Sequence, residues 1–127
     1  AYEVLPDIIS KEPLASWTKR GDENWFMIVR WTLMALIGAE ELGITKANVD
    51  EMVKSTNPDV RRLLGVDGAF GEQLGLTKDW AYRIVKHVGN YGEVFERHLG
   101  QGSKMKMARG LNGLWTKGGL QYAIPVR

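Results

Sequence analysis

The chain has 127 residues, of which 44% are hydrophobic and 25% are charged, a composition typical of one globular domain and not of a disordered or low-complexity sequence. Its 17 lysines and arginines and 15 aspartates and glutamates leave a formal charge of +2, which does not suggest a concentrated nucleic-acid-binding face. The absence of cysteine excludes disulfides, thiolate nucleophiles and cysteine-ligated metals.

The sequence pattern of the first 19 residues predicts extended structure. The chain begins at Ala1 without methionine or a signal-peptide pattern, so a mature, trimmed or excerpted form is expected. Residues 2–9 can supply one short strand, and residues 15–19 have a second extended pattern. Residues 11–13 predict a crossover between two structural elements, because Pro13 disfavours a helical conformation in the residue before it.

A long helix is predicted to follow. Asp22 is expected to cap it, apolar residues recur at intervals of three and four as far as Glu40, and Gly43 is expected to end it. Apolar residues also occupy its other sides, so the helix is expected to be buried nearly all round. Its apolar stretch, residues 25–39, is interrupted by Arg30 and is shorter than the roughly 20 residues that cross a bilayer.

Several shorter elements are expected in the middle of the chain. A short helix is predicted over residues 45–53, and Asn57 followed by Pro58 predicts the start of another that ends at Gly65. The glycine-rich residues 67–76 predict a loop with at most one turn.

The sequence pattern from residue 77 onward predicts the longest helix of the chain, followed by an amphipathic segment. Thr77 is expected to cap a helix reaching Leu99, with Gly89 and Gly92 marking a kink or a close backbone approach. Residues 104–115 form a basic amphipathic pattern, and an extended tail is expected from residue 120 onward.

No clear catalytic or metal-binding pattern appears. His87 and His98 are about three helical turns apart, too far to share a metal ion. Two carboxylate pairs could supply the acid and base of a lysozyme-like hydrolase, although like charges at helical spacing are more typical of a solvated face. These pairs are Glu40 with Glu41 and Glu93 with Glu96.

Phosphate and nucleic-acid motifs are similarly weak. The glycines of residues 65–71 lack the lysine and hydroxyl residue of a phosphate-binding loop. The basic residues Arg61 and Arg62, and the cluster of Lys104, Lys106 and Arg109, are expected to be solvated. The five tryptophans are expected mainly in the core, with Trp17 in a loop-like context.

Nine segments in order resemble the C-terminal part of the general L-amino-acid-binding periplasmic proteins, the solute receptors of polar amino-acid ABC transporters. They are VLPDIISKEPL (4–14), RGD (20–22), WFMIVRW (25–31), AEELGIT (39–45), NVDE (48–51), WAY (80–82), VGNYGE (88–93), ARGLN (108–112) and GGLQYA (118–123). The resemblance covers essentially the whole chain.

The resemblance implies a place for this chain in a larger fold. Family members are two-lobed α/β proteins of the type 2 periplasmic-binding-protein fold, and this mainly α chain with short extended termini would be their C-terminal portion. Residues 1–14 would end lobe two and make the second hinge crossing at Ser10, Lys11, Glu12 and Pro13. Residues 15–127 would be the C-terminal helical part of lobe one.

The resemblance also implies function and partners. The whole protein would capture an L-amino acid in the periplasm for the permease subunits of an ABC importer, with no enzyme activity, cofactor, metal, nucleic acid or membrane insertion. No ligand-binding residue is expected in this stretch, so the fragment alone would not bind ligand, and it could form a homo-oligomer. The alternatives are a self-standing helical interaction module and, third, the lysozyme-like hydrolase.

Overall fold

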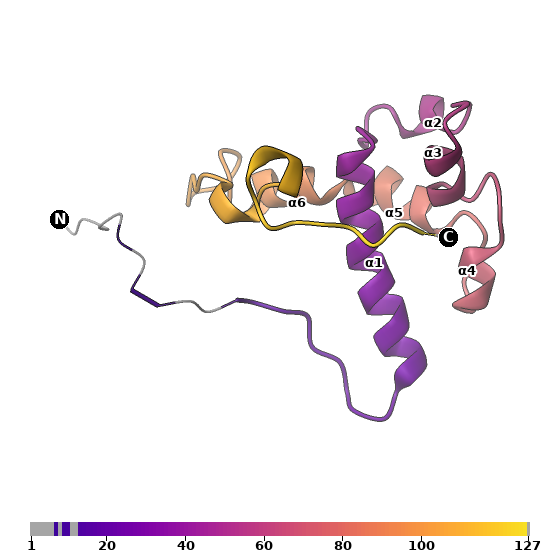
Figure 1. The fold of residues 1–127 in the computed structure, drawn as a ribbon, viewed down its shortest axis with the longest axis horizontal. Coiled ribbons are helices and arrows are strands. Elements are labelled where there is room, and N and C mark those ends of the chain that lie inside the picture. Colours follow the sequence, from indigo (N-terminus) through magenta and orange to yellow (C-terminus); the bar gives the residue numbers. More distant parts are fainter. Residues whose placement is uncertain (1–6, 8, 11–12, 127) are drawn as a thin grey trace.

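A computed structural model describes residues 7, 9–10 and 13–126 of the chain, and this part is mainly α-helical (Figure 1). The helices are α1 (Glu23–Glu41), α2 (Val49–Met52), α3 (Pro58–Leu63), α4 (Phe70–Gln73), α5 (Trp80–Val88) and α6 (Tyr91–His98), followed by the 3-10 turns η1 (Gly110–Asn112) and η2 (Trp115–Lys117). The mainly α fold class predicted from the sequence is confirmed.

Strand structure is almost absent from the described residues. An isolated parallel bridge joins Leu114 and Gln121. The extended pattern of residues 15–19 does not become a strand, because this segment runs away from the helices and has no neighbouring strand to pair with (Figure 1). The strand expected within residues 2–9 lies mostly outside the described residues.

Helix α1 begins and ends where its sequence predicts. The Asp22 side chain accepts a hydrogen bond from the backbone N–H of Trp25 at 3.0 Å, which satisfies one of the free donors of the first turn. At the other end Gly43 has a φ of +68°, the left-handed conformation that glycine adopts without strain.

The fully buried residues of α1 all lie in its C-terminal half, so the prediction that the helix is buried nearly all round is wrong. Ala35, Ile37 and Ala39 are buried, whereas Trp25 is 51% exposed and Phe26 is 43% exposed. Helices α3, α5 and α6 pack on the C-terminal half, and the N-terminal half extends beyond them (Figure 1). Apolar periodicity indicated which residues avoid water but not whether this chain covers them.

The predicted helix from Thr77 to Leu99 is in fact two helices, α5 and α6. Gly89 interrupts it with a φ of +91° and an extended ψ of −179°. Asn90 then caps α6 through a reciprocal capping box with Glu93, which starts a new helix in a new direction. The longest helix is therefore α1, and the kink expected at Gly89 is a complete break.

The main core lies between the C-terminal half of α1 and helices α2 to α5. Phe70 joins Trp31 and Trp80 in an aromatic cluster, with ring centroids 4.8 and 6.3 Å away. The buried members of this core are Ala35, Ala39, Ile44, Val49, Val60, Leu63, Leu64, Leu74, Trp80, Ala81 and Val85. Only some of the tryptophans are core residues, since Trp17, Trp25 and Trp115 are exposed.

The C-terminal region is irregular, so the amphipathic segment predicted at residues 104–115 is not a helix. A loop folds back on α6 through a bond from the Met107 N–H to the Leu99 carbonyl, and only the short turns η1 and η2 follow. Gly118 ends η2 with a φ of +80°. Residues 120–126, here named the strap, then cross α1 in extended form, as the sequence predicted (Figure 1).

Candidate functional site

The predicted hinge is only partly described. Ser10 and Pro13 are exposed and lie outside any helix, while Lys11 and Glu12 lie outside the described residues. The hinge role of the four residues therefore stays a prediction.

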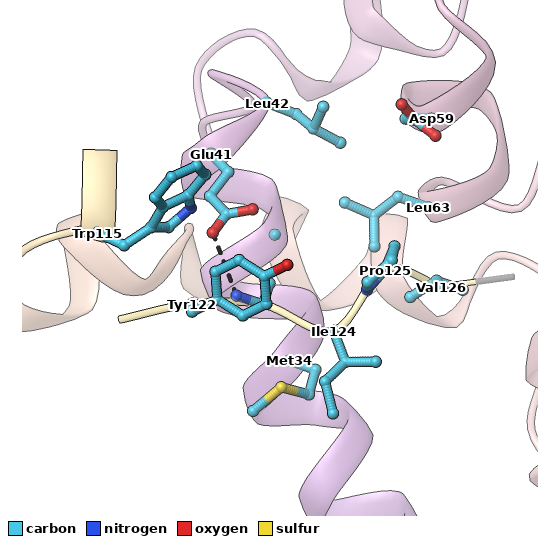
Figure 2. Close-up of a pocket in the computed structure, with 12 residues that line it drawn as sticks. Met34, Glu41, Leu42, Asp59, Leu63, Trp115, Tyr122, Ile124, Pro125 and Val126 are labelled. Carbon is cyan, nitrogen blue, oxygen red and sulfur yellow. Dashed lines mark hydrogen bonds between the residues drawn. The ribbon is translucent and has the colours of Figure 1, made fainter. Parts of the chain in front are cut away.

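A pocket of about 220 Å³ lies between the last turns of α1, the helix α3 and the strap (Figure 2). Its lining is mostly apolar and includes Met34, Gly38, Leu42, Leu63, Trp115, Tyr122, Ala123, Ile124, Pro125 and Val126. Its two carboxylates are already engaged by this chain. Glu41 Oε1 accepts a bond from the Ala123 N–H at 3.1 Å, and Asp59 pairs with Arg62 at 2.7 Å.

This pocket does not have the chemistry of an amino-acid site. An α-amino acid needs a cationic or N–H-rich group for its carboxylate and an acidic group for its ammonium, held in a largely enclosed cavity. The described residues that line the pocket include no lysine or arginine, and Glu41 is used to hold the strap. The pocket therefore gives no reason to revise the expectation that the ligand residues lie elsewhere.

A second polar feature joins two distant parts of the chain. Arg109 makes a bidentate pair with Glu40, with N–O distances of 3.0 and 3.1 Å. Its guanidinium also lies 5.5 Å from the ring centre of Tyr91 and 5.2 Å from that of Phe95. Gly92 makes room for the pair, since a Cβ there would come within 2.9 Å of both partners. The pair fixes the loop before η1 to α1 and α6.

The break between α5 and α6 is held by a third polar cluster. The Asn90 side-chain amide donates to the Ile44 carbonyl at 2.8 Å, and the Glu93 carboxylate accepts from the backbone N–H groups of Asn90 and Lys46. The Lys46 ammonium in turn donates to the His87 carbonyl at 3.1 Å. This cluster has a structural use, since each polar group holds a turn or helix end.

In each carboxylate pair considered as catalytic, the two carboxylates bind different partners. Glu40 binds Arg109 and Glu41 binds the strap. Glu93 caps α6, while Glu96 accepts a bond from the Gln101 N–H at 3.0 Å. The structure brings neither pair together on a shared cleft, which leaves the hydrolase hypothesis without a site among the described residues.

An exposed network connects α2 to α5. Asp50 pairs with Lys86 and accepts a 2.8 Å bond from the Tyr82 hydroxyl. The hydrogen bonds from Lys86 and then Tyr82 lower the pKa of Asp50. The hydrogen bond with Asp50 raises the pKa of both Tyr82 and Lys86. The three groups stabilise one another's charge state at the surface and line no enclosed site.

Metal and membrane sites receive no support from the described part of the chain. His87 and His98 are both exposed, and Arg97 Nε lies 3.3 Å from His98 Nε2. No cluster of metal-ligating side chains occurs among the described residues. Within the same residues, no helix combines the length and apolar character needed to cross a membrane.

Helix α1 has a mostly apolar stripe along a shallow groove. It recurs at helical spacing on one face and consists of Trp25, Ile28, Val29, Thr32, Leu33 and Leu36. Ser16 borders the shallow groove along this stripe. Trp25 is exposed and the other five residues are partly buried, with Ile28 and Leu33 packed at their inner sides against the core. A monomeric protein rarely exposes a continuous apolar face of this kind without a partner for it.

Comparison with known proteins shows extensive similarity over this chain. The chain is 63% identical over 126 residues to the general L-amino acid-binding periplasmic protein AapJ of Rhizobium johnstonii. The match covers 98% of this chain and 37% of AapJ. It is 54% identical over 125 residues to the glutamate/glutamine/aspartate/asparagine-binding protein BztA of Rhodobacter capsulatus, with the same coverage. No protein-family model matches the chain.

The fold of this chain is also similar to part of a solved structure. A periplasmic binding protein of an ABC transporter from Brucella ovis, with glutathione bound, matches with a TM-score of 0.93 and 60% sequence identity. The match covers 97% of this chain and 39% of that protein. None of these relatives is named as an interaction module or a hydrolase.

The resemblance recognised in the sequence is thereby confirmed, and the fold is that of part of a periplasmic binding protein. The chain spans only 37% of the length of the curated relatives it matches. This chain is a homologue, over nearly its whole length, of part of the amino-acid-binding periplasmic proteins of ABC transporters.

Proposed function

We propose that the chain is the C-terminal part of a periplasmic solute-binding protein that captures L-amino acids for the permease subunits of an ABC importer. The identity of 54–63% to amino-acid-binding proteins over 98% of the chain supports this. Residues 1–14 would end lobe two and form the second hinge crossing, and residues 15–127 would be the helical part of lobe one. The chain is not an enzyme in this proposal.

The observation that carries the proposal is the uncovered stripe on α1. Trp25, on the stripe, and Phe26, the next residue on the exposed N-terminal half of α1, are each about half exposed, and covering them would bury roughly 100 Å² of apolar surface per side chain. At about 25 cal/mol per Å², this is about 5 kcal/mol for the two residues, comparable with the whole stability of a small domain. The part of the relatives that this chain does not match would supply the covering surface.

The amino acid would be bound by that remaining part, with this chain completing the lobe. Among the described residues, the lining of the pocket beside the strap supplies no cation for the α-carboxylate, and the polar clusters described above are used to hold helices and loops together. The 127-residue chain alone should therefore bind no L-amino acid.

A chimera tests the proposal directly. The matching part of AapJ is replaced by this chain, and binding of a panel of L-amino acids is measured by calorimetry for AapJ, the chimera and the isolated chain. We expect AapJ and the chimera to bind the same amino acids, while the isolated chain binds none. A folded chimera without affinity, or micromolar affinity of the isolated chain, would refute the proposal.

Two matched tryptophan variants of the chimera test the role of the stripe. Trp25, on the stripe, is 51% exposed, and Trp115, outside it, is 53% exposed. Trp25→Gln should lower the thermal stability of the chimera and weaken its binding, because the residue packs against the rest of the lobe. Trp115→Gln should change both much less, and equal losses in the two variants would contradict the assigned role.

A further inference from the structure

The charges of this chain are unevenly distributed along it. Residues 97–127 contain six lysines and arginines and no aspartate or glutamate. The preceding residues contain the other eleven cations and all fifteen acidic residues. The formal charge of +2 therefore combines a segment of +6 with a larger part of −4.

Within this segment, residues 99–107 form a loop, here named the basic loop, that its own hydrogen bonds hold in place. The Met107 N–H donates to the Leu99 carbonyl at 2.9 Å, and the Gln101 side-chain amide donates to the Lys106 carbonyl at 3.2 Å. Lys106 has a φ of +49°, an uncommon conformation for a residue with a side chain. Such backbone conformations persist where the surrounding structure enforces them and often mark functional segments.

The basic loop alternates cations with apolar side chains that the rest of the chain does not cover. Lys104 and Lys106 are exposed, and neither takes part in an ion pair within the described residues. Met105 is 62% exposed and Met107 is 42% exposed. The loop lies beyond the end of α6, on the side of the structure away from α3 and α4 (Figure 1).

We propose that the basic loop docks on an anionic lipid surface. Lysine ammonium groups are attracted to acidic headgroups, while apolar side chains beside them enter the boundary between headgroups and acyl chains. The unbranched methionine side chains between the two lysines suit this boundary, and lysine stems extend along apolar surface while their charges stay in water. The contact is peripheral and requires no membrane-spanning segment.

The interleaving of charge with apolar groups favours a lipid surface over an acidic polypeptide. An acidic polypeptide would neutralise Lys104 and Lys106 but would leave Met105 and Met107 without an apolar environment. A lipid surface satisfies both kinds of side chain at once.

Vesicle partitioning tests the proposal on the 127-residue chain. Co-sedimentation is measured with vesicles of phosphatidylcholine alone and with about 30% phosphatidylglycerol. The proposal expects binding to the anionic vesicles that weakens as salt rises to about 0.5 M, because salt screens exposed charges. The double substitution Lys104→Gln and Lys106→Gln should lower the partition coefficient by about 25-fold, or about fivefold per lysine.

Matched variants separate this effect from that of net charge. Lys54→Gln combined with Lys78→Gln removes two exposed lysines outside the basic loop and should leave the partition coefficient within about twofold. Met105→Ser should weaken binding at unchanged charge. Equal binding to neutral vesicles, or equal losses in the two lysine double variants, would overturn the proposal.

The remaining possible outcome is that the basic loop binds an acidic polypeptide and not a lipid surface. Poly-L-glutamate is titrated against the chain and both lysine double variants, with circular dichroism confirming that each variant is folded. Binding of poly-L-glutamate that depends on Lys104 and Lys106, without binding to anionic vesicles, would overturn the lipid proposal and assign the surface to an acidic protein partner.

Discussion

Replacing Arg109 by methionine should destabilise the chain more than replacing any exposed arginine. Methionine keeps the aliphatic packing of the side chain but removes both bonds to Glu40 and the guanidinium contacts with Tyr91 and Phe95. The Glu40 side chain is only 12% exposed and that of Arg109 is 22% exposed. The substitution therefore leaves a poorly hydrated carboxylate without its cation.

The magnitude follows from this burial. Removing one partner of a fully buried ion pair costs about 3–5 kcal/mol, and partial access of water to this pair reduces the loss to about 2–3 kcal/mol. Loss of the cation–π contacts adds about 0.5–1 kcal/mol. A total of about 3 kcal/mol corresponds to a fall in Tm of about 10 °C for a domain of this size.

Arg62→Met is the matched control. Arg62 also makes a 2.7 Å ion pair with a carboxylate, that of Asp59, but the two side chains are 42% and 59% exposed. Exposed pairs contribute about 0–1 kcal/mol, so Arg62→Met should lower Tm by only a few degrees. Urea and thermal unfolding, followed by circular dichroism, measure both variants.

A double-mutant cycle with Glu40→Gln separates the ion pair from general packing. Because Glu40→Gln removes the unpaired charge, Arg109→Met should cost less in that background, with a coupling of about 1.5 kcal/mol or more. Equal destabilisation by Arg109→Met and Arg62→Met, or strictly additive effects of the Arg109 and Glu40 substitutions, would refute the reasoning.

Three further predictions concern other parts of the chain. The isolated chain should self-associate at micromolar concentration through the stripe on α1, and Trp25→Gln with Leu33→Gln should restore a monomer; sedimentation of the unsubstituted chain as a single 14.3 kDa species would contradict this. Since Lys86 lowers the pKa of Asp50, the stability that this carboxylate contributes is present above its ordinary pKa of 3.8 and is lost as pH falls through the lowered value. Asp50→Asn should therefore lower Tm at neutral pH and not at about pH 2, whereas a difference independent of pH would show that the pair contributes nothing. Pro13→Gly in the AapJ chimera should loosen hinge closure and weaken amino-acid affinity, and unchanged affinity with an unchanged scattering profile would count against the hinge assignment.

Some helix boundaries set by local chemistry were predictable from the sequence, although the helix starts predicted at residues 45 and 77 are wrong, since α2 begins at Val49 and α5 at Trp80. Asp22 and Asn57 both cap their helices with side-chain oxygens, and Gly43 and Gly65 both end their helices with positive φ. Each of these signals involves residues within one turn of one another, so no knowledge of the tertiary fold is required.

The break between α5 and α6 also had a local signal, which the apolar spacing concealed. Asn90 and Glu93 have the separation of a capping box, but apolar residues continue at intervals of three and four across Gly89. Each helix buries its own apolar residues, and the periodicity does not show that the axis changes direction between them.

Contacts between residues far apart in the sequence, and the exposure that depends on such contacts, could not be predicted from the sequence. Glu40 and Arg109 are 69 residues apart, and nothing local indicates that they pair. The exposure of the N-terminal half of α1 also depends on which elements surround it, and an apolar helix has the same pattern whether this chain or the rest of a longer protein covers it.

The adjacent residues Glu40 and Glu41, in the last turn of α1, bind the two ends of the segment of residues 109–123. Glu40 holds Arg109 and Glu41 holds the backbone of Ala123, so the intervening residues form a loop closed on a single helical turn. If that turn frays, both attachments are lost together, and the loop and strap open as one cooperative unit. Amide protons such as those of Ala123 and Leu42 should therefore share one opening free energy in native-state hydrogen exchange, although they are far apart in the sequence.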